Sequence, residues 1–216
     1  MPDFERKSSF ADVLIKRCDR VLRAASGLRP PLQREYPAAG VAGIVLDEKQ
    51  RRHAGALMRV NHSGEISAQA LYVGQALFAR NSATQERLAR AAGEETDHLY
   101  WCERRLHDLE SRPSVLNPVW FGGALAIGTL ASLCGDRWSL GFVEETEKQV
   151  VRHLQSHLEA LPYADAPSRA VVSAMCDDEA RHAADAAADG ARRLPQWVRG
   201  LMTVQARVMT RLAYWV

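Results

Sequence analysis

The sequence lacks the cysteine pattern that a disulfide framework or a zinc ribbon requires. Its 216 residues include four cysteines, which lie far apart and form no Cys-x-x-Cys pair. This spacing favours a protein of a reducing compartment. Residues 1–22 contain no apolar run of signal-peptide length, so we also expect no secretion.

An excess of charge of one sign is missing as well. The 28 Lys and Arg residues nearly balance the 26 Asp and Glu residues, which leaves a formal net charge of +2. This balance argues against nucleic acid as the main partner, because phosphate binding needs a concentrated basic surface. A glycine-rich phosphate loop and a Ser/His/Asp grouping are also absent from the sequence. The length suits one domain with its own core.

Strand-like alternation does not occur after residue 46, and the hydrophobic periodicity there is that of long helices. A shorter amphipathic pattern covers residues 8–25, and a segment with glycine and three prolines follows it. The sequence therefore predicts an all-α fold built on a four-helix bundle with additional helices. The four long helical patterns lie at residues 47–80, 83–111, 138–160 and 167–191.

Two stretches differ from these four. Residues 113–135 contain no charged side chain and are long enough to span a bilayer, although prolines, glycines and hydroxyl groups make them only moderately apolar. A membrane span, a buried helix and a membrane-facing surface are three interpretations, of which we prefer the last. Residues 194–216 form a basic amphipathic pattern with Trp197 and Trp215 near its ends, which is typical of a helix at a membrane interface, and a helix that packs against the protein is the alternative.

The alanine-rich segment "CDDEARHAADAAADG", residues 176–190, carries acidic residues and a histidine on a helix face that should be buried. Glu179 and His182 are three residues apart, so they project from that face together with small and apolar neighbours. The segment "GEETDHLYWC" repeats the pattern with Glu95 and His98. Because a buried Glu without a partner is costly, both pairs need a cation.

The other two long helices each offer an inward carboxylate. In the first, Glu65 is the single candidate, and Gly64 beside it would allow close approach of a neighbour. In the third, Glu147 shares its stripe with Val and Leu residues, Glu145 lies on a polar face, and Glu144 is intermediate. We therefore select Glu147.

The spacing of these residues indicates an internal repeat. Glu95 follows Glu65 by 30 residues and Glu179 follows Glu147 by 32, so each half reads as one antiparallel helical hairpin. Two Glu-x-x-His helices with one Glu from each of two others are typical of di-metal carboxylate proteins. Two divalent cations would balance the four carboxylates, and this ligand set suits iron or manganese. The predicted metal ligands are Glu65, Glu95, His98, Glu147, Glu179 and His182.

Further acids and histidines surround this set. Asp178 and Glu94 each precede a ligand Glu, and we expect each to accept the second N–H of a ligand histidine from the opposite helix. His153 and His157 stay open as substrate contacts or as supports of Glu147. The remaining histidines, which we expect to be structural or exposed, are His53, His62 and His107.

An ordinary helical bundle is the alternative to a metal protein. Its acids would be solvated and its histidines would be satisfied core residues, and it would explain either Glu-x-x-His pair alone. The complete six-residue set with its repeat spacing favours the metal centre instead.

The segments that carry these residues resemble those of a known family. The segments "RVNHSGEISAQALYVGQ", "EETDHL", "RPSVLNPVW", "GDRWSLGFVEETEKQV" and "DDEARH" are similar to those of the bacterial di-iron demethoxyubiquinone hydroxylases of ubiquinone biosynthesis. The similarity runs from Arg59 to the C-terminus and includes the stretches between the motifs, whereas residues 1–45 carry much less of it. The resemblance implies a ferritin-like bundle with the six ligands named above.

The resemblance also implies an activity. The enzyme would be a monooxygenase that hydroxylates the ring of a polyprenylated 6-methoxy-3-methyl-1,4-benzoquinol (demethoxyubiquinol), a late step of ubiquinone biosynthesis. Two iron ions per chain would be the cofactor, O₂ the co-substrate, and NADH or the quinol itself the reductant. Candidate partners are other ubiquinone-biosynthesis proteins and a second copy of the chain. No catalytic residue beyond the metal ligands is predicted.

A polyprenyl substrate favours a protein at a membrane. We predict a peripheral protein on the cytoplasmic side of the cell inner membrane. Residues 1–45 would form an N-terminal helix and a Pro-rich linker, and residues 46–216 a ferritin-like di-iron domain with membrane-facing helices.

Two other functions stay open at this point. One is a ferritin-like oxidase of iron or peroxide, although the Cys-x-x-Cys module of rubrerythrin-type members is absent. The other is a non-enzymatic bundle at the membrane surface that binds prenyl-quinones or lipids.

Overall fold

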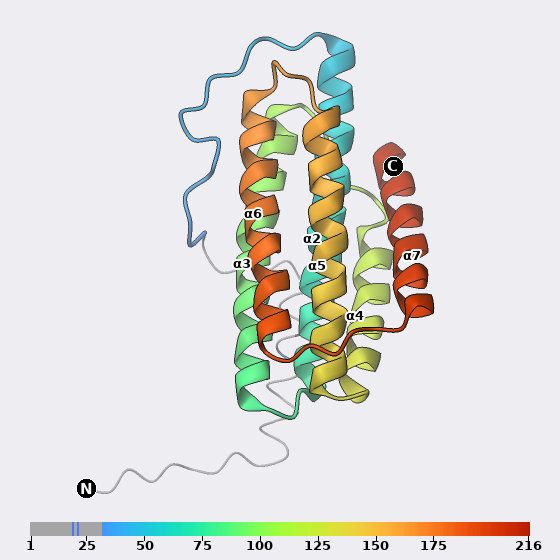
Figure 1. Ribbon diagram of the computed structural model, residues 1–216. Helices are drawn as coiled ribbons and strands as arrows, with labels where there is room; N and C mark the ends of the chain where they lie inside the picture. The colour runs from blue at the N-terminus through green and yellow to red at the C-terminus, as the bar shows by residue number, and fades with distance from the viewer. Residues whose placement is uncertain (1–18, 20, 22–31) are drawn as a thin grey trace, which may run out of the picture.

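The computed structural model describes residue 19, residue 21 and residues 32–216. This part of the chain contains six long α-helices and no strand, which confirms the predicted all-α class. The pattern at residues 8–25 lies almost wholly outside the described residues. The helices, labelled in Figure 1, are α2 (Glu48–Phe78), α3 (Ser82–Asp108), α4 (Asn117–Leu133), α5 (Asp136–Ala160), α6 (Ala166–Ala188) and α7 (Gln196–Trp215).

The helices α2, α3, α5 and α6 form a four-helix bundle, and α4 and α7 pack on one side of it (Figure 1). The pairs α2–α3 and α5–α6 are antiparallel hairpins, as the repeat spacing predicts. The predicted ends of the four long helices are confirmed to within three residues.

Polar side chains define where these helices begin. Asp47 accepts a hydrogen bond from the Gln50 backbone N–H, and the Gln50 side chain accepts one from the Asp47 N–H, which is a capping box at α2. Asn81 caps α3 with its side chain alone, which accepts a hydrogen bond from the Ala83 backbone N–H. Asp165 caps α6 and is buried, where it forms an ion pair of 2.8 Å with Arg105 of α3. This pair joins the two hairpins at one end of the bundle.

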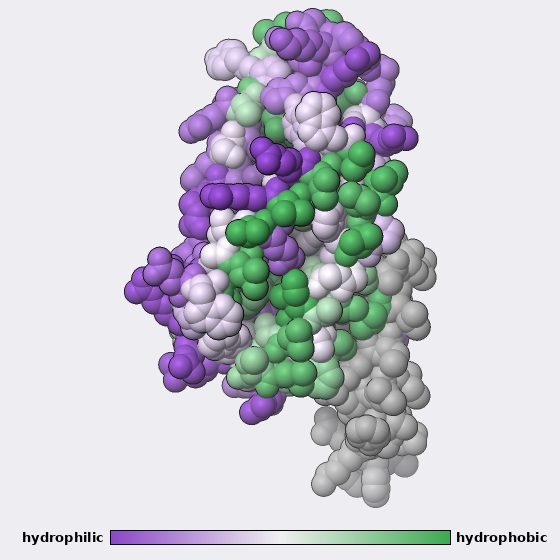
Figure 2. Space-filling model, turned by 90° about the vertical axis from the view of Figure 1, so that its right-hand side faces the viewer, coloured by the Kyte–Doolittle hydropathy of each residue, from purple (hydrophilic) through white to green (hydrophobic). Residues whose placement is uncertain are grey.

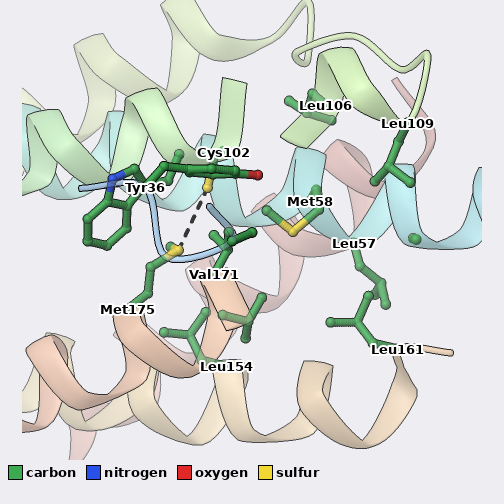
Figure 3. Packing of buried hydrophobic residues seen from close by; sticks show 14 residues of the cluster. Tyr36, Leu57, Met58, Cys102, Leu106, Leu109, Leu154, Leu161, Val171 and Met175 are labelled. Atoms are coloured by element: carbon green, nitrogen blue, oxygen red, sulfur yellow. Dashed lines mark hydrogen bonds between the residues drawn. The ribbon is translucent and has the colours of Figure 1, made fainter. Parts of the chain in front are cut away.

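An apolar core fills the bundle between this end and the middle. Met58 of α2, Cys102 of α3, Leu154 of α5 and Met175 of α6 are buried against one another (Figure 3). Tyr36, from the segment that precedes α2, joins the same cluster. The N-terminal segment is therefore packed onto the bundle from at least this residue.

Close contact between α4 and α2 depends on two glycines. A Cβ atom on Gly74 would lie 2.4 Å from the Leu125 carbonyl oxygen, and one on Gly128 would lie 2.3 Å from that of Leu71. The α4 helix therefore lies with one face against α2, while Val119 and Leu130 on its other face stay exposed. No helix in the described part of the chain has both the length and the hydropathy needed to cross a bilayer.

Candidate metal centre

The six predicted ligands come together inside the bundle. Each is buried, although every one carries an ionisable group, and the most exposed is His182 at 7%. The first hairpin supplies a Glu from α2 and a Glu-x-x-His pair from α3, and the second hairpin supplies the same from α5 and α6. The six residues are Glu65, Glu95, His98, Glu147, Glu179 and His182.

Four of the six form a tight group. One ligand atom from each of Glu65, Glu95, His98 and Glu179 lies within 4.8 Å of the others. The His98 Nδ1 atom is 3.3 Å from Glu65 Oε2, 3.1 Å from Glu95 Oε2 and 3.2 Å from Glu179 Oε1. A single N–H donates to one acceptor well, so one imidazole nitrogen cannot satisfy three carboxylates.

The other two residues adjoin this group. His182 Nδ1 lies 3.1 Å from Glu179 Oε2 and 3.6 Å from Glu95 Oε1. Glu147 is fully buried and accepts a hydrogen bond of 2.5 Å from the Tyr72 hydroxyl. Its competitors lie elsewhere: Glu144 pairs with Lys148 and Glu145 with Gln149 on the half-buried outer side of α5. The selection of Glu147 as a ligand stays a prediction, and its position supports it.

Unsatisfied carboxylate oxygens make this group fit divalent cations. Glu95 Oε1, Glu147 Oε2 and Glu179 Oε1 are buried and have no hydrogen-bond partner. Buried acceptors that lack both water and a donor are strongly unfavourable. Carboxylate oxygens and imidazole nitrogens without thiolates are ligands that iron and manganese accept. A pair of such ions would satisfy the free oxygens and balance the negative charge.

Burial and the crowding of carboxylates also shift the pKa values of this group. Burial and the neighbouring Glu179 and Glu65 carboxylates raise the pKa of Glu95 well above its ordinary value. Burial, with the charges of Glu179 and Glu95, raises the pKa of Glu147 in the same way. Burial alone would lower the pKa of His182, but its hydrogen bond with Glu179 and the charge of Glu95 raise it to about 9. Without cations, the cluster therefore holds protons in their place.

Both ligand histidines are oriented by a carboxylate from the opposite hairpin. His98 Nε2 lies 2.9 Å from Asp178 Oδ2, and His182 Nε2 lies 3.0 Å from Glu94 Oε2. These are the two contacts expected from the sequence. If Nε2 donates its hydrogen outward, the Nδ1 lone pair of each ring points into the carboxylate group, where a metal ion would bind.

Sequence analysis missed three residues that contact this centre. Tyr72 follows Glu65 by seven residues on the same helix face, and that spacing is a signal that could have identified it. Arg181 donates to Glu94 and Asp178, and it precedes a ligand histidine. Arg34 donates to Asp178 from the segment before α2, where no periodic pattern indicates its contacts.

Other predictions have mixed outcomes. His107 is exposed, and His53 and His62 bind neighbours in the described structure, as expected. His153 and His157 lie on α5 with ring centroids 4.0 Å apart, and His153 lines the cavity described below, so their roles as substrate contacts or supports of Glu147 stay predictions. The expectation for Gly64 is wrong, because a Cβ atom there would meet nothing within 4 Å. Gly64 lines a cavity instead.

This cavity has a volume of about 300 Å³ and lies between α2, α4, α5 and α7. Its lining extends from Val119, which is exposed at the surface, to Glu65 of the tight group. Most of the side chains between these ends are apolar, among them Leu71, Trp120, Ile127, Phe142, Met202 and Met209. An apolar molecule that enters between α4 and α7 would therefore reach the candidate metal centre.

Comparison with known proteins agrees with this arrangement. Residues 52–213 match the family described as "Ubiquinone biosynthesis protein COQ7". A 3-demethoxyubiquinol 3-hydroxylase of Xanthomonas oryzae pv. oryzae (strain PXO99A) is 53% identical, over 97% of this chain and 96% of that protein. Proteins of the same name from Nitrosococcus oceani and Bordetella petrii are 48% and 50% identical over 98% and 99% of this chain, and 99% and 95% of their own lengths.

The matched range contains all six predicted ligands, the whole of α4 and all but the last two residues of α7. The family resemblance of the motifs is therefore confirmed over most of the sequence. This chain belongs to the COQ7 family of ubiquinone biosynthesis proteins.

Proposed function

We propose that this protein hydroxylates the ring of demethoxyubiquinol at a centre of two iron ions held by Glu65, Glu95, His98, Glu147, Glu179 and His182. The observation that carries the proposal is the apolar cavity that ends at Glu65. A polyprenylated quinol is an apolar molecule with a polar ring, so it fits an apolar cavity that reaches Glu65, a member of the one dense group of potential metal ligands in the described part of the chain. Relatives at about half identity carry the name of this reaction.

The overall reaction balances with O₂ and two electrons. One oxygen atom replaces a ring hydrogen as a hydroxyl, and the other leaves as water after taking up two protons. Reduced nicotinamide or the quinol itself supplies the electrons. The bound irons would supply the O₂ chemistry.

The protein's own residues provide binding and shielding. The cavity walls of α4 and α7 would hold the prenyl tail, and the buried position of Glu95 and Glu179 keeps water from the centre. Asp178 and Glu94 hold the ligand imidazoles in one orientation. The Tyr72 hydroxyl holds the Glu147 carboxylate.

The apolar surface around the cavity suits a membrane-bound substrate. Figure 2 shows a continuous hydrophobic band on the face of the molecule that carries α7. On α7, Trp197, Leu201 and Trp215 are 72%, 63% and 77% exposed. Arg207 and Arg211 lie beside this band and have no acidic partner among the described residues. We propose that this face lies on the anionic cytoplasmic surface of the inner membrane, so that prenyl-quinols enter from the lipid.

A quinone profile tests the reaction. In a bacterial strain without its own demethoxyubiquinol hydroxylase, expression of this chain should restore ubiquinone and remove the demethoxy intermediate. The matched control is Glu179→Ala, which removes a predicted ligand. A profile in which the wild-type chain leaves the intermediate in place would reject the hydroxylase.

Liposome co-sedimentation tests the membrane face. The double variant Leu201→Glu, Val208→Glu should lose binding to anionic vesicles, because it places charge in the apolar band. Tyr163→Glu is the control, since Tyr163 is 90% exposed in the loop between α5 and α6. Equal binding by both variants would contradict the proposed face.

A further inference from the structure

The N-terminal segment places a guanidinium against the outer side of the metal centre. Arg34 Nη1 lies 2.5 Å from Asp178 Oδ2, the same oxygen that is 2.9 Å from His98 Nε2. Arg34 Nε lies 3.0 Å from Asp97 Oδ2. One planar group therefore joins a buried carboxylate of α3 to the carboxylate that orients a ligand histidine.

Further contacts fix the guanidinium in this position. Its central carbon lies 4.7 Å from the centre of the Trp101 ring, which is a cation–π contact. Trp101 is buried and lies 5.2 Å from the His98 ring, measured between centroids. The preceding residue is anchored too, because the Gln33 backbone N–H donates to Asp97 Oδ1 over 2.9 Å. In Figure 1, the segment that begins at residue 32 runs along the bundle beside α3 and α6.

Asp178 depends on arginines from two sources. Arg181 holds Oδ1 at 2.6 Å from within α6, and Arg34 holds Oδ2 from outside the bundle. On the other ligand histidine, the Glu94 carboxylate is held by Arg181 among the described residues, and Arg34 reaches only the Glu94 backbone carbonyl, at 3.5 Å. The carboxylate that orients His98 therefore receives a hydrogen bond from the N-terminal segment, and the carboxylate that orients His182 receives none from the described part of that segment.

We propose that Arg34 is a positioning residue of the metal centre, which acts through Asp178 to fix the His98 ring with Nδ1 toward the metal. Residues 33–36 thereby become part of the functional unit, although they lie before the range that matches the family. The inference rests on the proposed metal centre. It assigns the N-terminal segment a role in metal affinity, in addition to covering the core.

Metal titration of the apo-protein tests this role without the quinol reaction. The probe is Co²⁺ alone, whose visible absorption reports on ligand geometry. Loss of a partner of a ligand histidine typically weakens metal binding about 10–100-fold, and Arg34 acts one contact further out, so Arg34→Gln should weaken it about 3–10-fold and alter the spectrum. Arg34→Lys, which keeps the charge but reaches one carboxylate at a time, should fall between Arg34→Gln and the wild type.

A control and a double variant separate positioning from packing. Arg104→Ala removes the cation–π contact on Tyr36, 4.4 Å from the ring centre, and so loosens the same segment without touching Asp178. It should bind Co²⁺ within about twofold of the wild type, as expected for an exposed contact. Because Arg34 acts through Asp178, the double variant Arg34→Gln, Asp178→Asn should bind no more weakly than Asp178→Asn.

Three results would overturn the inference: wild-type affinity in Arg34→Gln, an equal loss in Arg104→Ala, or additive losses in the double variant. Thermal melting of each apo-protein checks folding, and if Arg34→Gln is unfolded, Arg34→Lys carries the comparison. A wild-type protein that binds no Co²⁺, Mn²⁺ or Fe²⁺ would instead reject the metal centre itself, together with this role.

Discussion

The two helical hairpins supply the same ligands but have different surroundings. Glu65 of the first hairpin lines the apolar cavity, whereas Glu147 of the second does not and is held by the Tyr72 hydroxyl. In the repeat, the position equivalent to Tyr72 is Leu154, so no tyrosine donates to Glu65. The repeat therefore explains the predicted ligand set, and the two equivalent glutamates differ: Glu65 faces the cavity, and Glu147 is held by Tyr72.

Removal of the equivalent glutamates should have the largest effect. Glu65→Ala and Glu147→Ala each delete one carboxylate of a buried set, so both should lose most of the bound iron and all measurable hydroxylation. Glu144→Ala removes an outer carboxylate that pairs with Lys148, and it should keep both. Metal analysis of the purified proteins measures iron per chain. Iron loss in Glu144→Ala with retention in Glu147→Ala would reverse the assignment on α5.

Blocking the cavity should have the next largest effect, which should be on hydroxylation and not on iron content. Gly123 lines the cavity and Gly122 does not, and a Cβ atom on either would meet nothing within 4 Å. Gly123→Leu should place its side chain in the substrate path and reduce hydroxylation roughly tenfold, with an unchanged iron content. Gly122→Leu is a neighbouring control with the same change in helix propensity.

Activity assays with a prenylated quinol in detergent or vesicles measure this difference. If both leucine variants are equally active, substrate does not pass α4 at this point. If both variants lose iron, the leucine side chains disturb folding, which a lower melting temperature would confirm. Gly123→Ala, a smaller change at the same position, then replaces Gly123→Leu in the activity assay.

Loss of the tyrosine should have a smaller effect, on the second hairpin. Tyr72→Phe removes the hydroxyl that donates to Glu147 and leaves that carboxylate with fewer partners. In the apo-protein, burial favours the protonated Glu147 carboxyl, and a hydrogen bond between neutral groups contributes about 0.5–1.5 kcal/mol, so the free energy of unfolding should fall by about this amount. Denaturant titration measures it. Tyr163→Phe, at an exposed tyrosine, is the control, and an equal change in both would contradict a role for Tyr72.

Local pattern was enough to predict the helices and the inward faces. Glu179 and His182 lie on a stripe of small residues, so helical spacing alone places both in the interior. The local sequence pattern could not predict contacts between segments that lie far apart in the chain. Arg34 meets Asp97 across 63 residues of sequence, and its own segment has no periodicity. Gly64 shows a second limit: spacing gives the face of a glycine, but what opposes that face depends on tertiary packing.

A last predicted effect, confined to acidic pH, again separates the hairpins. Ten residues after the ligand glutamate, the first hairpin has Gln75, which donates to the Ser139 carbonyl, and the second has His157. Burial, with the nearby His153 and His53, lowers the pKa of His157 from 6.5 to about 3. The buried ring is therefore neutral in the folded protein at any pH above this value.

His157 should make the stability of the protein depend on pH in the acidic range. Above pH 6.5 the ring is neutral in both states, so it contributes its full share of stability there; as the pH falls below 6.5 the unfolded chain takes up a proton that the folded chain does not. Stability should then fall by up to about 1.4 kcal/mol per pH unit for this one group. In denaturant titrations between pH 7.5 and 5, His157→Gln should lose less stability than the wild type. His107→Gln, at an exposed histidine, should follow the wild type, and a parallel fall in all three proteins would mean that other groups set the acid sensitivity.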